Sequence, residues 1–157
     1  MSTISNDQEF RAALNALSLD RQRAVGALFV ENVRQLSGDR RIGQAIAAAR
    51  DSALSEEDLN AARRGAKAAS LEAHTRCGAD GEWSDQAGYF VARAAEACVE
   101  PVVRSKGKNP AWKAAMSARM ARTCLAADSD EDSHDSESAA QYKILTSYLD
   151  ERGTSHE

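Results

Sequence analysis

Apolar residues recur three or four positions apart along almost the whole chain, which is the spacing of one face of an α-helix. Only two prolines and few β-branched runs interrupt this pattern, and no segment shows the alternation that is typical of a strand. The pattern therefore predicts an all-α fold of about six to seven helices. The expected helices cover residues 7–16, 19–36, 40–53, 56–76, 85–100, 111–125 and 139–151.

Residues that typically cap helices stand at several of these boundaries. Ser55, followed three residues later by Asp58, resembles a capping box. Asn109 before Pro110 is a favoured helix start, Ser18 can cap the helix at 19–36, and Gly38 can stop it in the left-handed conformation. Short connections make consecutive helices antiparallel neighbours, so we expect a compact bundle or a short stack of antiparallel helical hairpins.

The length of 157 residues suits one domain. We expect residues 1–127 to form its helical body. Residues 128–138 are acidic, polar and low in complexity, which predicts a flexible loop with nothing to bury. Residues 139–152 are amphipathic and should form a C-terminal helix that docks on the same domain.

The composition limits the core and the location of the protein. Apolar residues make up 43% of the chain, but aromatic residues only 5%, and many of the apolar residues are alanine. This predicts a thin core between closely packed helices. Three cysteines cannot pair completely, the N-terminus lacks the features of a secretion signal, and no apolar run is long enough to span a membrane. These features favour a cytoplasmic protein without contact to a membrane.

The sequence offers few groups for chemistry. His74 and Cys77, with Cys98 and Cys124, are the best candidates for a zinc site, but antiparallel helices would place Cys98 at the opposite end of the bundle from Cys77 and Cys124. Buried thiols are the better interpretation, and no metal site is expected. No histidine stands in a pattern typical of catalysis, and no glycine motif cradles a phosphate. We therefore expect neither an enzyme nor a bound cofactor.

Charge is distributed unevenly along the chain. The net charge of −4 argues against binding to nucleic acid. Either of two charged groups could steer a protein partner of opposite charge, although a solvated surface would also explain them. The candidate partner-binding residues are the arginines Arg40, Arg41, Arg63 and Arg64, expected to be exposed, and the acids Asp130, Glu131, Asp132 and Asp135. The two groups predict partners of opposite charge.

One stretch resembles a known family. An apolar helix ends in the turn Gly38-Asp39-Arg40-Arg41, an alanine-rich helix follows from Ile42 to Arg50, and the run Ser55 to Arg64 begins a further alanine-rich helix. This order resembles the alanine-rich helical immunity proteins of bacterial polymorphic toxin systems, over roughly residues 20–125. The resemblance implies a cytoplasmic antidote that covers the active or substrate-binding face of a toxin without performing chemistry.

Two other functions stay open from the sequence. A structural or adaptor protein could associate with itself or scaffold other proteins, while an antidote should be a monomer or a small homo-oligomer. A helical bundle that binds a small molecule would need a deep pocket lined by polar groups, and the sequence gives no sign of one. Trp83 and Trp112 could each lie in the core or at an interface.

Overall fold

The computed structural model describes residues 3–77, 83–100, 109–126 and 133–154. These ranges contain seven α-helices, one 3-10 turn and no strand, so the predicted all-α fold is confirmed. The elements are α1 (Asp7–Asn15), α2 (Leu19–Val33), η1 (Arg34–Leu36), α3 (Arg40–Arg50), α4 (Glu56–Cys77), α5 (Trp83–Cys98), α7 (Pro110–Ala126) and α8 (Ser133–Thr154).

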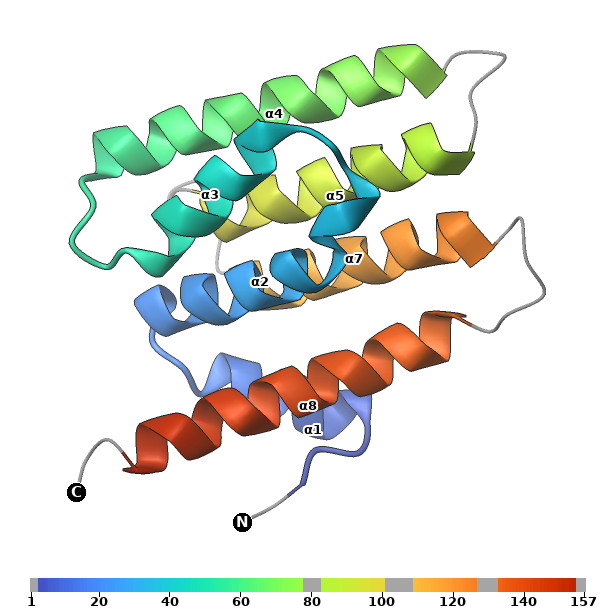
Figure 1. Ribbon diagram of the computed structural model, residues 1–157. Coiled ribbons are helices and arrows are strands. Elements are labelled where there is room, and N and C mark those ends of the chain that lie inside the picture. Colours follow the sequence, from blue (N-terminus) through green and yellow to red (C-terminus); the bar gives the residue numbers. More distant parts are fainter. Residues whose placement is uncertain (1–2, 78–82, 101–108, 127–132, 155–157) are drawn as a thin grey trace.

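The long helices lie side by side in a compact bundle (Figure 1). α4, α5 and α7 form a row of antiparallel neighbours, α2 and α3 pack across this row, and α8 and α1 close its far side (Figure 1). The predicted antiparallel arrangement is therefore present. None of the helices in the described ranges combines the length and the apolar character needed to cross a membrane.

Side chains cap several helix starts, as the sequence predicts. Ser55 Oγ accepts a hydrogen bond from the Asp58 amide at 3.1 Å, and Asn109 Oδ1 accepts one from the Ala111 amide at 2.9 Å. Each bond satisfies an N–H group that has no partner within its own helix. Local sequence therefore determines where α4 and α7 begin.

α2 begins at Leu19 and, with η1, ends at Leu36 as predicted, but two expected caps and the end of α3 differ in detail. The backbone of Gly38 is not left-handed, because α2 continues into η1 and the chain then extends at Ser37 with φ −132°. Ser18 occupies the N-cap position of α2, but its side chain makes no capping bond. α3 ends at Arg50, three residues earlier than expected, and Asp51 Oδ1 then accepts a hydrogen bond from the Ala53 amide at 3.0 Å. This turn competes with the helix for the same backbone group.

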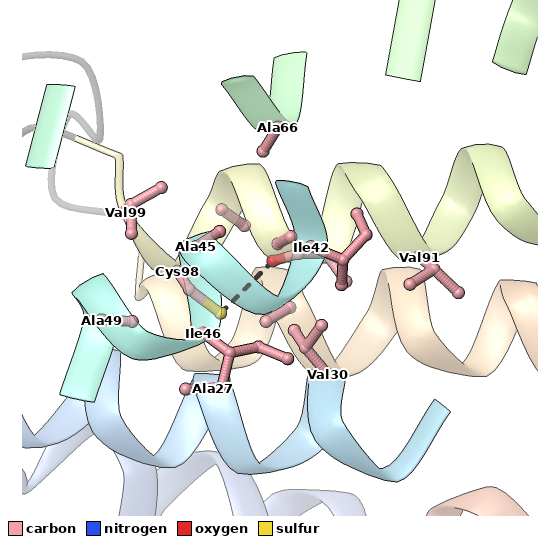
Figure 2. Packing of buried hydrophobic residues seen from close by; sticks show 14 of the residues in the cluster. Ala27, Val30, Ile42, Ala45, Ile46, Ala49, Ala66, Val91, Cys98 and Val99 are labelled. Carbon is pink, nitrogen blue, oxygen red and sulfur yellow. Dashed lines mark hydrogen bonds between the residues drawn. The ribbon is translucent and has the colours of Figure 1, made fainter. Parts of the chain in front are cut away.

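Alanine dominates the core between α2, α3, α4, α5 and α7. Figure 2 shows Ala27, Ala45 and Ala49 around the Cys98 thiol, which donates a hydrogen bond to the carbonyl of Ala94 at 3.3 Å. Complete burial raises the pKa of Cys98 far above its ordinary value, so this thiol remains protonated. Small side chains let the helices approach closely, as the composition predicts.

A second core cluster supplies the larger side chains and joins the helical body to α1 and α8. Phe10 of α1 is fully buried against Phe29 of α2, with ring centroids 5.5 Å apart, and against Tyr142 of α8, at 5.3 Å. The docking of the C-terminal helix on the same body is therefore present, and Phe10 lies at the junction.

The start of α8 corrects the prediction of a flexible loop over residues 128–138. Residues 133–138 belong to α8, and Glu137 is 2% exposed. Its carboxylate accepts hydrogen bonds from Asn32 Nδ2 at 2.9 Å and from Arg122 Nε at 3.2 Å. An acidic run was expected to have nothing to bury, but a carboxylate can be buried when donors from other helices pair with it. Residues 128–132 lie outside the described part of the chain.

Candidate protein-binding surface

The four arginines proposed from the sequence have different environments. Arg40 and Arg64 are exposed, as expected, and Arg41 is half-buried. Arg63 is only 8% exposed, so its predicted exposure is wrong. Its Nε donates to Asn60 Oδ1 at 3.0 Å, and its Nη1 lies 3.9 Å from a carboxylate oxygen of Glu96 on α5. Arg63 thus helps to join α4 to α5 and is not available to a partner.

The burial of Arg63 has a signal in the sequence. It lies four residues after Leu59 and three before Ala66, so it belongs to the stripe of α4 that faces the core. Helical spacing therefore places it inward, and only its charge suggests an exposed position. Glu96 compensates the charge of the buried Arg63. It is 33 positions away in the chain, so its distance from Arg63 depends on how α4 and α5 pack.

Arg41 is held by two carboxylates. It donates two hydrogen bonds to Asp39, the N-cap of α3, and forms an ion pair with Glu72 of α4. The hydrogen bond from Arg41 lowers the pKa of the Asp39 carboxyl, and Arg41 lowers the pKa of Glu72 in the same way. Two acids thus offset the charge of Arg41, which leaves Arg40 and Arg64 as the exposed cations of the predicted group.

The Asp39–Arg41 pair gives a prediction about pH. Since the folded pKa of Asp39 is lowered, its stabilisation is present above the ordinary pKa of an aspartate and is lost as the pH falls through the folded pKa. Asp39→Asn keeps a capping oxygen but removes the charge. We expect this variant to be less stable than the native protein by about 1 kcal/mol at neutral pH. The difference should shrink as the pH falls below the ordinary pKa of an aspartate, and chemical denaturation at neutral and at acidic pH measures it. An unchanged difference at the lower pH would contradict this origin.

Most of the acidic residues proposed to bind a partner lie outside the residues that the structure describes. Asp130, Glu131 and Asp132 lie outside the described residues, and Asp135 falls in the first turn of α8. Their role in partner binding stays a prediction from the sequence.

A hollow with a half-buried aromatic residue in its wall lies between α1 and the start of α7. It has a volume of about 530 Å³, and we call it the Trp112 groove. Its lining residues are Arg11, Asn15, Asn109, Trp112, Lys113, Met116 and Ser117.

The side chain of Asn109 positions one end of the Trp112 groove. Asn109 uses its Oδ1 to accept hydrogen bonds from the amides of Ala111 and Trp112, which fixes the first turn of α7. Its Nδ2 donates to Asn15 Oδ1 at the end of α1, at 3.0 Å. One side chain therefore both starts α7 and ties it to α1, so that the two walls of the groove have a defined separation.

Trp112 is half-buried and is packed on both faces. On its inner side the Phe10 ring lies 6.1 Å away between centroids, and on its outer side the Arg11 guanidinium carbon lies 4.9 Å from the indole centroid. A guanidinium over an indole is a favourable cation–π arrangement. Trp112 thus contacts the core and borders the surface, and its role at an interface stays a prediction.

Methionines continue the apolar surface along α7. Met116 is half-buried one helical turn beyond Trp112, and Met120 a further turn along is 45% exposed. Unbranched methionine side chains adapt to irregular partner surfaces, and tryptophan, arginine and methionine are enriched at protein interfaces. The groove and this stripe could have been suspected from the spacing 112, 116 and 120, but the same spacing predicts a core face equally well.

The charges around the groove are positive. Arg11 is exposed and forms no ion pair with any carboxylate in the described ranges, whereas Lys113 is paired with Glu100. None of the described residues that line the groove is acidic. The surface therefore suits an apolar side chain flanked by carboxylates.

Neither similarity to known proteins nor the arrangement of metal-binding side chains indicates another candidate site. No protein-family model, no curated protein and no solved structure matches the chain. Among the described residues, no group of three or more histidine, cysteine, aspartate or glutamate side chains is placed to hold a metal ion.

Proposed function

We propose that this chain works by binding another protein through the Trp112 groove, and that it acts as an antidote to a bacterial toxin. The observation that carries the binding proposal is the stack of the exposed Arg11 on the half-buried Trp112, beside Met116 and Met120. Hot spots of protein interfaces are rich in tryptophan and arginine and are surrounded by adaptable apolar contacts. The toxin as partner follows from the resemblance of residues 20–125 to immunity proteins.

The groove favours an acidic partner segment. Its uncompensated cation is Arg11, and its floor is apolar around Trp112 and Met116. A segment with an apolar side chain between carboxylates would fill the floor and neutralise Arg11. For a toxin that acts on nucleic acid, such an acidic segment would lie outside the basic substrate site, and neutralisation would then be steric.

Substitution of Trp112 should weaken binding strongly. We expect Trp112→Ala to lose at least about 2 kcal/mol of binding free energy, or about thirtyfold in Kd, because truncation of a hot-spot tryptophan typically costs this much. Titration calorimetry with the isolated partner measures the loss. Since Trp112 also contacts Phe10, we choose Arg11→Glu as a second variant, which reverses an exposed charge and removes the cation–π contact with Trp112 but leaves the core side chains in place.

Matched controls come from α3 and α4. Arg40→Glu and Arg64→Glu reverse exposed charges outside the groove and should leave the affinity nearly unchanged. If these two variants lose more affinity than Arg11→Glu, the arginine group around α3 and α4 is the binding surface and the Trp112 groove is not.

Identification of the partner needs a functional readout. The tagged protein is used to capture partners from the cells that produce it, at low and moderate salt, because charge-steered contacts weaken as salt rises. The captured protein is then expressed alone and together with the native chain or Arg11→Glu. Growth arrest that only the native chain relieves supports the antidote. A captured protein without toxicity, or a chain that forms only a defined oligomer by light scattering, supports the structural or adaptor alternative.

A further inference from the structure

A cavity separate from the Trp112 groove lies where parts of four helices meet. The first two turns of α2, the end of α3 with the turn after it, the start of α4 and Tyr148 of α8 surround a volume of about 330 Å³. Its walls include Arg21, Arg23, Arg50, Asp51 and Glu56. This is near the lower limit of cavities that hold small ligands. The polar pocket of which the sequence gave no sign is therefore present in the structure.

Arg23 is the unusual member of this cavity. It is only 8% exposed, yet it forms no ion pair within 4.0 Å with any carboxylate of the described residues. Its Nη2 donates to the Glu100 carbonyl at 3.1 Å, while its buried Nε has no hydrogen-bond partner. A buried charge without a counter-charge is unfavourable, and buried donors without acceptors are rare. The guanidinium thus has charge and donor capacity that no described protein group uses.

The hydrogen bond from Arg23 to the Glu100 carbonyl accounts for only part of the buried guanidinium's charge and donor groups. Glu100 lies two residues beyond Cys98, the last residue of α5, so a cation there interacts favourably with the negative end of that helix. A single carbonyl, however, uses one of the five N–H groups of an arginine and supplies no full negative charge. A structural cap would also not require a cavity beside the same side chain.

Other charges around the cavity restrict what can enter. Arg21 and Arg50 add positive charge, and Asp20, Asp51 and Glu56 add negative charge. Asp51 already accepts a hydrogen bond from the Ala53 amide. The three lining arginines and the three lining acids balance, so a ligand with several negative charges would be repelled by the acids after it paired with Arg23.

We propose that this cavity binds a small molecule with one anionic group, a carboxylate or a phosphate, whose oxygens accept hydrogen bonds from Arg23. The rest of the ligand is neutral and polar or carries a positive charge, which suits the three acids that line the same cavity. Arginine is well adapted to this role, because its planar donors match the two oxygens of such groups. The site is independent of the Trp112 groove and of the proposed partner.

Nuclear magnetic resonance of arginine side chains tests the proposal directly. The Nε–Hε signals of the full chain are followed during separate titrations with acetate, inorganic phosphate, glycine and citrate, and the Arg23 signal is assigned from its absence in Arg23→Met. We expect a saturable shift of the Arg23 signal with at least one of the first three probes, and weaker binding of citrate. The probe that saturates distinguishes carboxylate from phosphate ligands. Shifts that stay linear for all four probes would overturn the proposal.

A second measurement tests whether Arg23 binds the probe or has only a structural role at the end of α5. We expect the bound probe to raise the Tm of the native protein and of Arg64→Met, a control that removes an exposed arginine from α4. Arg23→Met should show no such rise, and Arg23→Lys, which keeps the charge but loses the planar donors, should bind about tenfold more weakly or worse. An equal rise of Tm in the native protein and in Arg23→Lys and Arg23→Met would show that the probe binds elsewhere and would refute the assignment.

Discussion

Replacement of Phe10 by alanine should lower the free energy of unfolding by about 3–5 kcal/mol. Phe10 is fully buried, and its ring lies within 5.5 Å of the Phe29 ring and 5.3 Å of the Tyr142 ring, between centroids. The Arg119 guanidinium carbon also lies 5.6 Å from its ring centroid. Truncation would leave a cavity among side chains of α1, α2, α7 and α8, which cannot all move inward together. Chemical denaturation followed by circular dichroism measures the loss.

Two variants test the origin of this effect. Phe10→Leu keeps most of the volume and should cost clearly less than Phe10→Ala. Leu71→Ala removes a side chain that is 57% exposed on α4 and should change stability by no more than about 0.5 kcal/mol. Equal losses for Phe10→Ala and Leu71→Ala would mean that α1 does not contribute to the cooperative core. Because Phe10 also supports Trp112, we expect Phe10→Ala to weaken partner binding as well.

Replacement of Gly26 by valine should cost about 3 kcal/mol or more, because it overfills the closest helix contact in the core. A Cβ atom on Gly26 of α2 would lie 3.1 Å from Cys98 Sγ, 3.4 Å from Ala111 Cα and 3.5 Å from Ala114 Cβ. Two of these neighbours belong to α7, and Ala111 Cα is backbone. Valine adds two methyl groups to this contact, so α2 would have to move away from α5 and α7. Thermal and chemical denaturation measure the cost.

The shortest of these contacts can be tested by compensation. Removal of the sulfur in a Gly26→Val, Cys98→Ala double variant should recover part of the lost stability, whereas the Ala111 backbone prevents full recovery. Gly38→Ala is the matched control, since an added Cβ at Gly38 meets no atom within 4 Å. A loss of similar size at Gly38 would show that glycine flexibility, and not crowding at α2, determines the result.

Polar contacts over long chain separations hold α8 in place, and the sequence did not reveal them. Gln141 is fully buried, and its Oε1 accepts a hydrogen bond from Arg119 Nε at 2.8 Å, while Arg119 also pairs with Asp7 of α1. Helical periodicity predicts that residues 139–152 form an amphipathic helix that docks on the body, and Leu145 of this helix is buried. It could not identify Gln141 or Glu137, because a polar residue gives no sign of burial until its partners are known.

The same distinction applies to the candidate sites. The sequence made Trp112 an open candidate for an interface, whereas Arg23 was not a candidate. The groove beside Trp112 arises because α1 is tied to α7 by Asn15 and Asn109, which are 94 positions apart. The Arg23 cavity arises where α2, α3, α4 and α8 meet without closing the space between them. Neither the spacing of α1 and α7 nor the space of the Arg23 cavity follows from a local sequence pattern.

The sequence by itself determined that this protein is all-α, approximately where its helices run, and that alanine would allow them to pack closely. These properties depend on spacing and on capping bonds within a few residues, as at Ser55 and Asn109. The tertiary structure alone decided that Glu137 is buried, that Glu96 lies beside the inward-facing Arg63, that Trp112 borders a groove and that Arg23 lines a cavity. The physical reason is that the burial of a charged or polar side chain depends on partners from other helices, and only the packing of the helices brings those partners within reach.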